Sequence, residues 1–311
     1  MKPWSPFTFF LLGGVILFQV ARAQYTGTRI ISQDGYDACV ELSNASTRVV
    51  LDPNLGGRVL RYELHGKNIL HEDPSKNGKL HEPGTEFGHP PAGRIDIGPQ
   101  WISPKRPALF LGAWEARITD HRQAVMTSMQ DTSTGVQLTR YFTLDAESSH
   151  LQIRQVIRNV SDDTVRYCYW GRSFAKGGGI SLTPLNPHSR YPRGYLVHGP
   201  GLVMDFMPAN EENVRVRDGI LEILGPPTRP KFGMDSYPGW LAYISQDHLL
   251  FVKKFPVYSH RVYGEMAGYT TSIWYNQEEM VEIEPLGPLE IMAPGTSSEF
   301  TVDWHLMEYT Y

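Results

Sequence analysis

The stretch Met280–Gly295 reads MVEIEPLGPLEIMAPG and carries the clearest fold signal in the chain. Two apolar residues alternate there with Glu282 and Glu284, as in a β-strand with an apolar face and a carboxylate face. Pro285 follows at once, and a proline cannot donate to a strand ladder, so we expect the strand to end there. The segment is either an edge strand with a solvated charged face or a strand end whose carboxylates point into a concavity.

Similar short alternating segments, separated by turns, recur from Tyr25 onward, with almost no helical periodicity. We expect strands at 38–42, 47–51, 58–64, 116–119, 124–130, 136–143, 151–159, 164–170, 202–206, 220–224, 239–245, 249–255, 271–275, 280–284 and 300–307. Strands that follow one another in this way predict an all-β antiparallel sandwich or barrel with few or no helices. Two segments rich in glycine and proline, 68–100 and 171–200, are expected to be long ordered excursions outside the strands that help to build a site.

The N-terminal residues resemble a targeting segment. Lys2 precedes an apolar run over 7–20, and Ala21-Arg22-Ala23 has the small-x-small form of a signal-peptidase site. We expect residues 1–23 to be a signal peptide and residues 24–311 to form one domain that is secreted or periplasmic. An uncleaved membrane anchor is the alternative, but the run is short for a bilayer span. No later stretch is long and apolar enough to cross a membrane, so no membrane partner is expected after cleavage.

Composition narrows the choice of partners. The net charge is −4 and no long basic run is present, which argues against nucleic acid. The aromatic content of 12%, with 7 Trp, suits a sugar-binding surface as well as a β core. Cys39 and Cys168 are the two cysteines and could pair in an oxidising compartment. No spacing of ligand residues predicts a metal site, and no cofactor is expected.

Several segments carry a resemblance to a known superfamily. The stretch 52–70, DPNLGGRVLRYELHGKNIL, resembles the opening of galactose mutarotase-like (aldose 1-epimerase-like) proteins, and its two glycines fit a tight bend. Segments 135–145 and 151–159 resemble the hairpins of the middle of that domain. Segment 231–243 is similar to a secreted branch described as a domain of unknown function. The resemblance spans nearly all of 24–311. It implies a large antiparallel β-supersandwich whose concave face takes a carbohydrate.

The resemblance also implies a chemistry. Sugar anomers interconvert when a base removes the proton of the anomeric hydroxyl and an acid protonates the ring oxygen. In the mutarotases these groups are a Glu on a late strand and a His in a mid-chain motif. Glu284 matches the Glu, with Glu282 as the fallback. The His should fall within 167–179, which reads YCYWGRSFAKGGG and contains Arg172 and Lys176 but no His. The acid would then be His188, His198 or Lys176.

Substrate-binding candidates combine a charge with a nearby Trp, which offers hydrogen bonds to hydroxyls and a flat face to a sugar ring. They form three sets: Arg94, Asp96 and Trp101 in the sequence GRIDIGPQW; Arg172 beside Trp170; and Lys231 with Asp235 and Trp240. The first set could equally be a salt bridge that anchors a loop over a core Trp. An arginine cluster could also hold an anionic sugar.

Three functions remain open from the sequence. The first is an exported aldose epimerase or mutarotase with Glu284 as base. The second is a carbohydrate-recognition domain without catalysis, which the missing His favours. The third is glycan cleavage of the polysaccharide-lyase type, for which Tyr258, His260 and Arg261 form the one compact set.

Overall fold

The structure is a computed structural model that describes residues 1, 25–201, 203–265, 267–277 and 279–310. Apart from Met1, the predicted signal peptide lies outside the described residues, so its cleavage stays a prediction. None of the helices in the described portion has the length and apolar character needed to cross a membrane.

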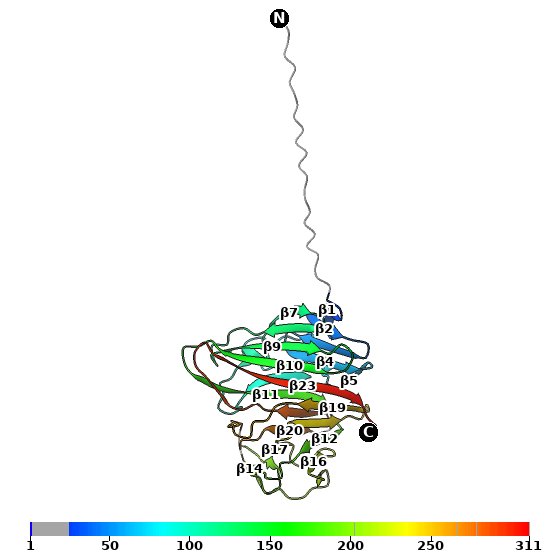
Figure 1. Ribbon diagram of the computed structural model, residues 1–311, viewed down its shortest axis with the longest axis vertical. Helices are drawn as coiled ribbons and strands as arrows, with labels where there is room; N and C mark the ends of the chain where they lie inside the picture. The colour runs from blue at the N-terminus through cyan, green and yellow to red at the C-terminus, as the bar shows by residue number, and fades with distance from the viewer. Residues whose placement is uncertain (2–24, 202, 266, 278, 311) are drawn as a thin grey trace.

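The described residues form two large antiparallel sheets (Figure 1), which confirms the predicted all-β class. The first sheet has the order β1-β2-β3-β4-β6-β11-β21-β20-β17-β13-β14, with β5 beside β4 and β22 beside β11. Its strands are β1 (Thr28–Gln33), β2 (Tyr36–Ser43), β3 (Thr47–Asp52), β4 (Arg58–Leu64), β5 (Lys67–Asn68), β6 (Gly93–Gly98), β11 (Val165–Lys176), β13 (Leu196–His198), β14 (Met204–Asp205), β17 (Lys231–Met234), β20 (Thr271–Asn276), β21 (Met280–Pro285) and β22 (Glu290–Met292).

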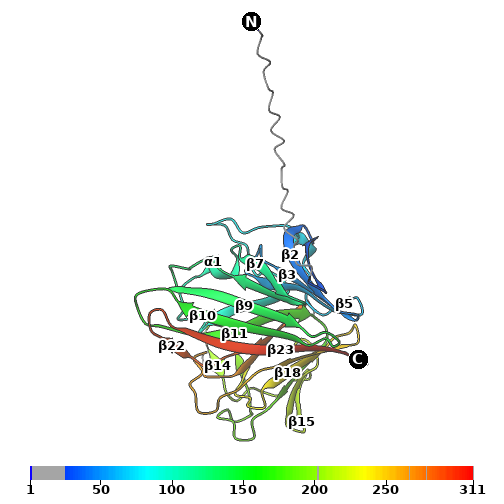
Figure 2. The ribbon, with the colours of Figure 1, turned by 45° about the horizontal axis from the view of Figure 1, so that its top comes forward.

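The second sheet has the order β15-β16-β12-β18-β19-β23-β10-β9-β8-β7. Figure 2 shows β9, β10 and β23 of this sheet in front. Its strands are β7 (Glu115–Asp120), β8 (Gln123–Thr127), β9 (Val136–Leu144), β10 (Leu151–Asn159), β12 (Ile180–Pro184), β15 (Val214–Arg217), β16 (Ile220–Ile223), β18 (Trp240–Ile244), β19 (Leu249–Lys254) and β23 (Ser297–Glu308). The described helices are one short α-helix, α1 (Pro107–Phe110), and one 3-10 turn (Pro74–Lys76).

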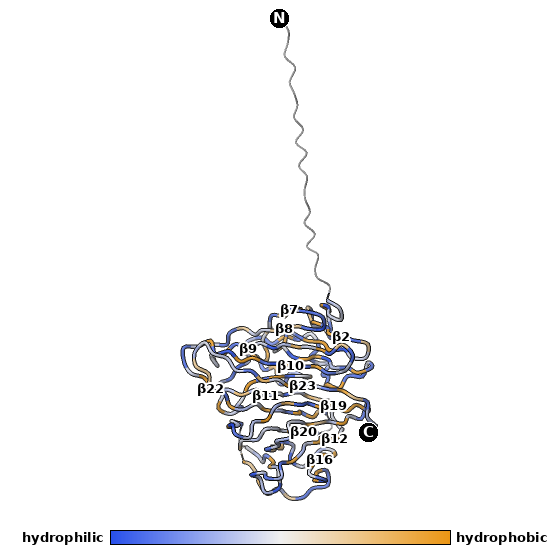
Figure 3. Tube along the Cα trace, viewed as in Figure 1, coloured by the Kyte–Doolittle hydropathy of each residue, from blue (hydrophilic) through white to orange (hydrophobic). Residues whose placement is uncertain are grey.

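The core lies between the two sheets because alternate residues of each strand point inward. Apolar and polar residues accordingly alternate along several strands in Figure 3. The ring of Tyr62 on β4 lies 5.7 Å from the ring of Phe251 and 5.7 Å from that of Trp304, both on the second sheet. These aromatic contacts join the sheets at the centre of the core.

Strand β21 lies inside the first sheet, between β11 and β20, so the interpretation of this segment as an edge strand is wrong. Val281 and Ile283 face the core. Glu282 and Glu284 face the other way, yet both are only 1% exposed. Their burial shows that this face of the sheet is covered, and it places two carboxylates in a low-dielectric environment.

The two excursions contain more strand than expected. Strand β6 lies within 68–100 and all of its residues are buried, while β12, β13 and the second half of β11 lie within 171–200. The glycines and prolines that suggested loops flank these strands. Strand β6 also carries Arg94 and Asp96, and charged residues rarely mark a buried strand.

The bend at Gly56 and Gly57 has the form that the glycine pair predicts. Both residues have positive φ, +68° and +58°, and a Cβ on Gly56 would lie 2.2 Å from the carbonyl oxygen of Phe110. The buried guanidinium of Arg140 on β9 donates to the carbonyl oxygens of both glycines at 2.7 Å and to that of Ile95 at 2.6 Å. One side chain of the second sheet thereby satisfies the backbone of the first.

Candidate functional site

One row of side chains crosses the covered face of the first sheet. Cross-strand pairing places Glu282 between Phe174 of β11 and Trp274 of β20, and it places Trp274 opposite Lys231 of β17. Directly paired residues on one face lie close enough for their side chains to touch. Aromatic rings and charges therefore alternate along this row, an arrangement that suits polar ligands with a flat apolar face.

A cavity of about 270 Å³ opens over this row. We call it the Trp101 cavity, after the residue at its mouth that is 55% exposed. Its lining combines aromatic rings with cationic and carboxylate groups: His89, Gln100, Trp101, Arg172, His198, Gly201, Lys231, Tyr269, Trp274 and Glu282.

Glu284 lies behind this wall with both carboxylate oxygens occupied. Its Oε2 accepts a hydrogen bond from Trp170 Nε1 at 2.6 Å, and its Oε1 accepts one from the Lys231 ammonium. Burial, together with the charge of Glu282, raises the pKa of Glu284 above its ordinary value despite the contact with Lys231. Glu284 can therefore take up a proton more readily than an exposed glutamate.

Glu282 has the opposite electrostatic environment. Its Oε1 accepts from Arg172 Nε at 2.9 Å. Burial alone would raise the pKa of Glu282, but the charges of Arg172, Lys231 and Arg94 outweigh burial and hold that pKa below its ordinary value. Two carboxylates on one strand face are thus pushed apart in pKa, which is a common property of acid–base sites.

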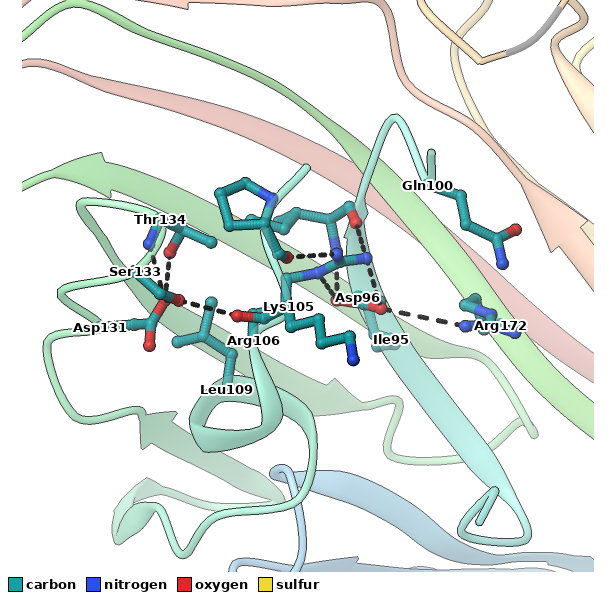
Figure 4. Close-up of polar contacts among 12 residues, drawn as sticks. Ile95, Asp96, Gln100, Lys105, Arg106, Leu109, Asp131, Ser133, Thr134 and Arg172 are labelled. Carbon is teal, nitrogen blue, oxygen red and sulfur yellow. Dashed lines mark hydrogen bonds and ion pairs between the residues drawn. The ribbon is translucent and has the colours of Figure 1, made fainter. Parts of the chain in front are cut away.

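Asp96 forms an ion pair with Arg106, which Figure 4 shows. Its two oxygens accept from Arg106 Nε at 2.8 Å and Arg106 Nη2 at 2.9 Å, and Arg172 Nη1 lies 4.0 Å away. Arg106 also donates to the carbonyl oxygen of Ile97 at 2.6 Å. Asp96 therefore forms a salt bridge with Arg106 and not with Arg94, and Trp101 is exposed, so the expected salt bridge of the first set over a core Trp is not the one that forms. Asp96 can orient Arg172, but it is not among the residues that line the Trp101 cavity.

Arg94 is buried beside the cavity and lacks a carboxylate partner within the described residues. Its Nη1 lies 3.1 Å from His89 Nδ1, and its guanidinium carbon lies 5.0 Å from the centre of the Phe174 ring. Its Nε and Nη2 are buried with no hydrogen-bond partner in the described part of the chain. Burial and the neighbouring charge of Arg172 lower the pKa of Arg94 to about 9.

The three proposed acids are placed differently. His198 lines the Trp101 cavity, and its Nε2 is buried without a partner among the described residues. Burial, and to a smaller extent the positive charge of Lys231, lower the pKa of His198 to about 4, so His198 is neutral at pH 7. His188 is exposed in a loop. Lys176 lies at the far end of β11, where its ammonium is 3.1 Å from Asp247 Oδ2. The structure therefore brings only His198 of this set to the cavity.

Most of the remaining predicted binding residues are near the cavity or in it, but Trp240 lies on β18 of the second sheet, and Asp235 accepts from the hydroxyl of Ser189 at 2.5 Å and does not line the cavity. Trp101, Arg172, Lys231 and Glu282 line it, and buried Trp170 stacks under Arg172 at 4.2 Å. The lyase-like set is not among the lining residues, and its Arg261 pairs with Glu290 at 2.6 and 2.8 Å.

Cys39 and Cys168 are both buried and free. Among the described residues, no three His, Cys, Asp or Glu side chains cluster as metal ligands would.

Sequence reasoning missed five lining residues: His89, Gln100, Gly201, Tyr269 and Trp274. One of them had a usable signal. Segments 271–275 and 280–284 were both expected as strands, and the short connection between them fits a hairpin that pairs Trp274 with Glu282. The other four lie in loops, whose path no periodicity defines.

Comparison with solved structures places this fold among known ones. A galactose mutarotase-like protein from Lactobacillus casei matches with a TM-score of 0.60 and 10% identity, over 86% of this chain and 100% of the other. A candidate aldose 1-epimerase from Escherichia coli K12 matches with a TM-score of 0.59 and 11% identity, over 91% and 100%. A galactose mutarotase-like protein from Clostridium acetobutylicum matches with a TM-score of 0.56 and 10% identity, over 91% and 99%.

These similarities establish the galactose mutarotase-like fold and confirm the expected supersandwich. At the level of sequence, neither a protein-family model nor a curated protein matches this chain. Identities of 10–11% leave the activity to be argued from the site itself.

Proposed function

We propose that this protein binds a carbohydrate in the Trp101 cavity. The observation that supports this most is the combination of aromatic faces and charged groups in one small concavity. Trp101 and Trp274 offer flat apolar surfaces, while Arg172, Lys231 and Glu282 offer donors and an acceptor. A sugar ring can use both kinds of group, because it has an apolar face that stacks on an aromatic ring and a rim of hydroxyls that form hydrogen bonds.

The volume sets the expected size of the ligand. Pockets for drug-sized molecules usually measure roughly 300–1,000 Å³. The Trp101 cavity, at about 270 Å³, is smaller and fits a single sugar ring. Trp101 is exposed at the mouth, so a second ring of an oligosaccharide could stack on its outer face.

The same site supports an anomer interconversion as the reaction. In the ring-opening step the base takes the proton of the anomeric hydroxyl, the acid gives a proton to the ring oxygen, and the bond between that oxygen and the anomeric carbon breaks. Reclosure on the other face of the carbonyl reverses the two proton transfers. Glu284 is the base in this proposal. Lys231, which is in contact with Glu284, supplies the acid that the absent motif His would provide.

Binding without catalysis is the second candidate, and one observation favours it. Both oxygens of Glu284 already accept hydrogen bonds, from Trp170 and Lys231, and Glu284 is not among the residues that line the cavity. A base must reach the proton that it removes. Under this candidate Glu284 only fixes the positions of Trp170 and Lys231.

Saturation-transfer NMR with a panel of free hexoses and uronates tests both candidates in one sample. Transfer to ligand protons reports binding, and exchange between the α and β anomeric signals reports catalysis. We expect binding that is lost in Trp101→Ala and kept in the control Tyr141→Ala, an exposed aromatic of the other sheet. Absence of transfer from every sugar would contradict the proposal.

We also propose that the protein is exported, on the basis of the N-terminal sequence alone. Expression of the full chain followed by N-terminal sequencing of the extracytoplasmic product is the test. A mature N-terminus at Gln24 would support export. An intact N-terminus on protein that remains in the cytoplasm would contradict it.

A further inference from the structure

Three of the carboxylates around the Trp101 cavity already have cationic partners, while Glu265 accepts from the backbone N–H of Gln100 at 2.7 Å. Asp96 pairs with Arg106, Glu282 with Arg172, and Glu284 with Lys231. These three carboxylates have six oxygens in all. Both oxygens of Glu284 and both oxygens of Asp96 accept hydrogen bonds. Little acceptor capacity is therefore left for a ligand that must donate hydrogen bonds.

Donor capacity is in surplus on the same wall. Arg172 and Lys231 line the cavity, and each has N–H groups beyond those that bind Glu282 and Glu284. Behind them, Arg94 has two buried N–H sites, Nε and Nη2, with no partner in the described residues. An unpartnered buried donor of a charged group is costly, so a counter-group is expected nearby.

Strand pairing also brings two of these cationic side chains together. Arg94 of β6 and Arg172 of β11 are directly opposite each other in the sheet. Like charges at directly paired positions destabilise a sheet, and here both residues are buried. Three cationic groups, Arg94, Arg172 and Lys231, are thus gathered at the cavity, and Glu282 and Glu284 have ion-pair contacts with only two of them. Asp96 and Arg106 cancel each other.

We propose that the ligand is an acidic sugar whose anionic substituent is held by Arg172 and Lys231, with the unpartnered donors of Arg94 behind them. This inference rests on the proposed carbohydrate-binding function and names its substrate class. A carboxylate or a phosphate ester meets the same chemistry, because both accept several charge-assisted hydrogen bonds from guanidinium and ammonium groups.

Isothermal titration calorimetry on the mature protein tests the inference with matched ligands. Each hexose is compared with its uronate and with its 6-phosphate; glucuronamide serves as the neutral isostere of glucuronate, and inorganic phosphate as the anion without a sugar. We expect at least one acidic sugar to bind about tenfold or more tightly than its neutral parent, with affinity that falls as salt rises. Preference for uronates or for phosphates identifies which acidic group the site takes.

Arg94→Met is the decisive variant. Arg94 has no carboxylate partner, so its removal leaves no buried carboxylate without a counter-charge. We expect its affinity for the acidic sugar to fall about tenfold or more, while affinity for the neutral parent changes little and the melting temperature is kept or raised. Arg154→Met, an exposed arginine of β10, is the control and should leave both affinities unchanged.

The outcomes separate this inference from the proposed function. Equal affinity for acidic and neutral sugars, or an unchanged acidic affinity in folded Arg94→Met, would overturn the inference and leave sugar binding intact. Failure of every sugar to bind the folded wild type would overturn both.

Discussion

Lys231 and Glu284 form an ion pair across an intervening strand. Lys231 is on β17 and Glu284 on β21, with β20 between them. The residue of β20 that pairs with Glu284 is Ser272, which is small enough to leave the lysine a path over it. The pair connects Lys231, which lines the cavity, to the strand that carries Glu282 and Glu284. Variants of either partner therefore test what this ion pair contributes to activity and stability.

Glu284→Gln should abolish anomer exchange while sparing sugar binding, if the protein is an epimerase. Gln keeps the shape of the side chain but cannot take a proton, and its single acceptor oxygen can serve only one of the donors Trp170 and Lys231, so we expect a rate loss of about 100-fold or more. Two-dimensional exchange NMR measures the rate. Glu290→Gln, in a carboxylate paired with Arg261 outside the cavity, is the control. Exchange that persists unchanged in Glu284→Gln would show that the base is another group.

Removal of Lys231 should destabilise the protein more than the loss of one surface charge. Lys231→Met leaves the carboxylate of Glu284 buried with Trp170 as its remaining hydrogen-bond partner in the described residues, at a cost of about 3 kcal/mol. In the double variant Lys231→Met/Glu284→Gln no charge is stranded, so the combined loss should be smaller than the sum by about 1 kcal/mol or more. Urea denaturation of the four proteins measures this coupling. Additive losses would mean that the two groups do not interact.

Acid should weaken the fold through two histidines of the Trp101 cavity, His89 and His198. Burial, with Lys231 near His198 and Arg94 near His89, lowers the pKa of each to about 4 from an ordinary value of 6.5. The unfolded chain therefore binds more protons than the folded chain between these values, and the free energy of unfolding should fall as pH drops from about 6.5 to 4. Glu284 and Glu265, whose pKa values are raised by burial, act in the opposite direction.

Denaturation at several pH values measures this slope, and His198→Gln and His89→Gln should each flatten it. His121→Gln, at an exposed position, is the matched control and should keep the wild-type slope. Equal slopes in all four proteins would contradict the assignment of the acid sensitivity to these two histidines.

Arg140 should be one of the most sensitive positions for stability. Its guanidinium satisfies the carbonyl oxygens of Gly56, Gly57 and Ile95, and it stacks 4.2 Å from the centre of the Trp114 ring. Arg140→Met leaves these acceptors unpaired and should cost about 3 kcal/mol or more. Arg154→Met, in an exposed pair with Glu299, should change stability by less than about 1 kcal/mol. Similar thermal unfolding of the two variants would contradict this role.

The sequence predicted the fold better than the site because the two depend on different information. Strands such as β4 and β10 can be predicted because apolar and polar residues alternate along them, and their predicted bounds match the structure. Glu282 and Glu284 were correctly placed on one face for the same reason. The roles of Asp96 and Lys176 depend on partners far away in the chain, Arg106 after a loop and Asp247 in another turn, and alternation does not encode these.

A structure of the mature protein soaked with the tightest-binding sugar of the panel tests the central claim most directly. We predict density for one sugar ring inside the Trp101 cavity, between Trp101 and Trp274, with its polar substituents within hydrogen-bond distance of Arg172 and Lys231. A sugar bound on another face, with the cavity unoccupied at saturating ligand, would contradict the claim that this cavity is the carbohydrate site.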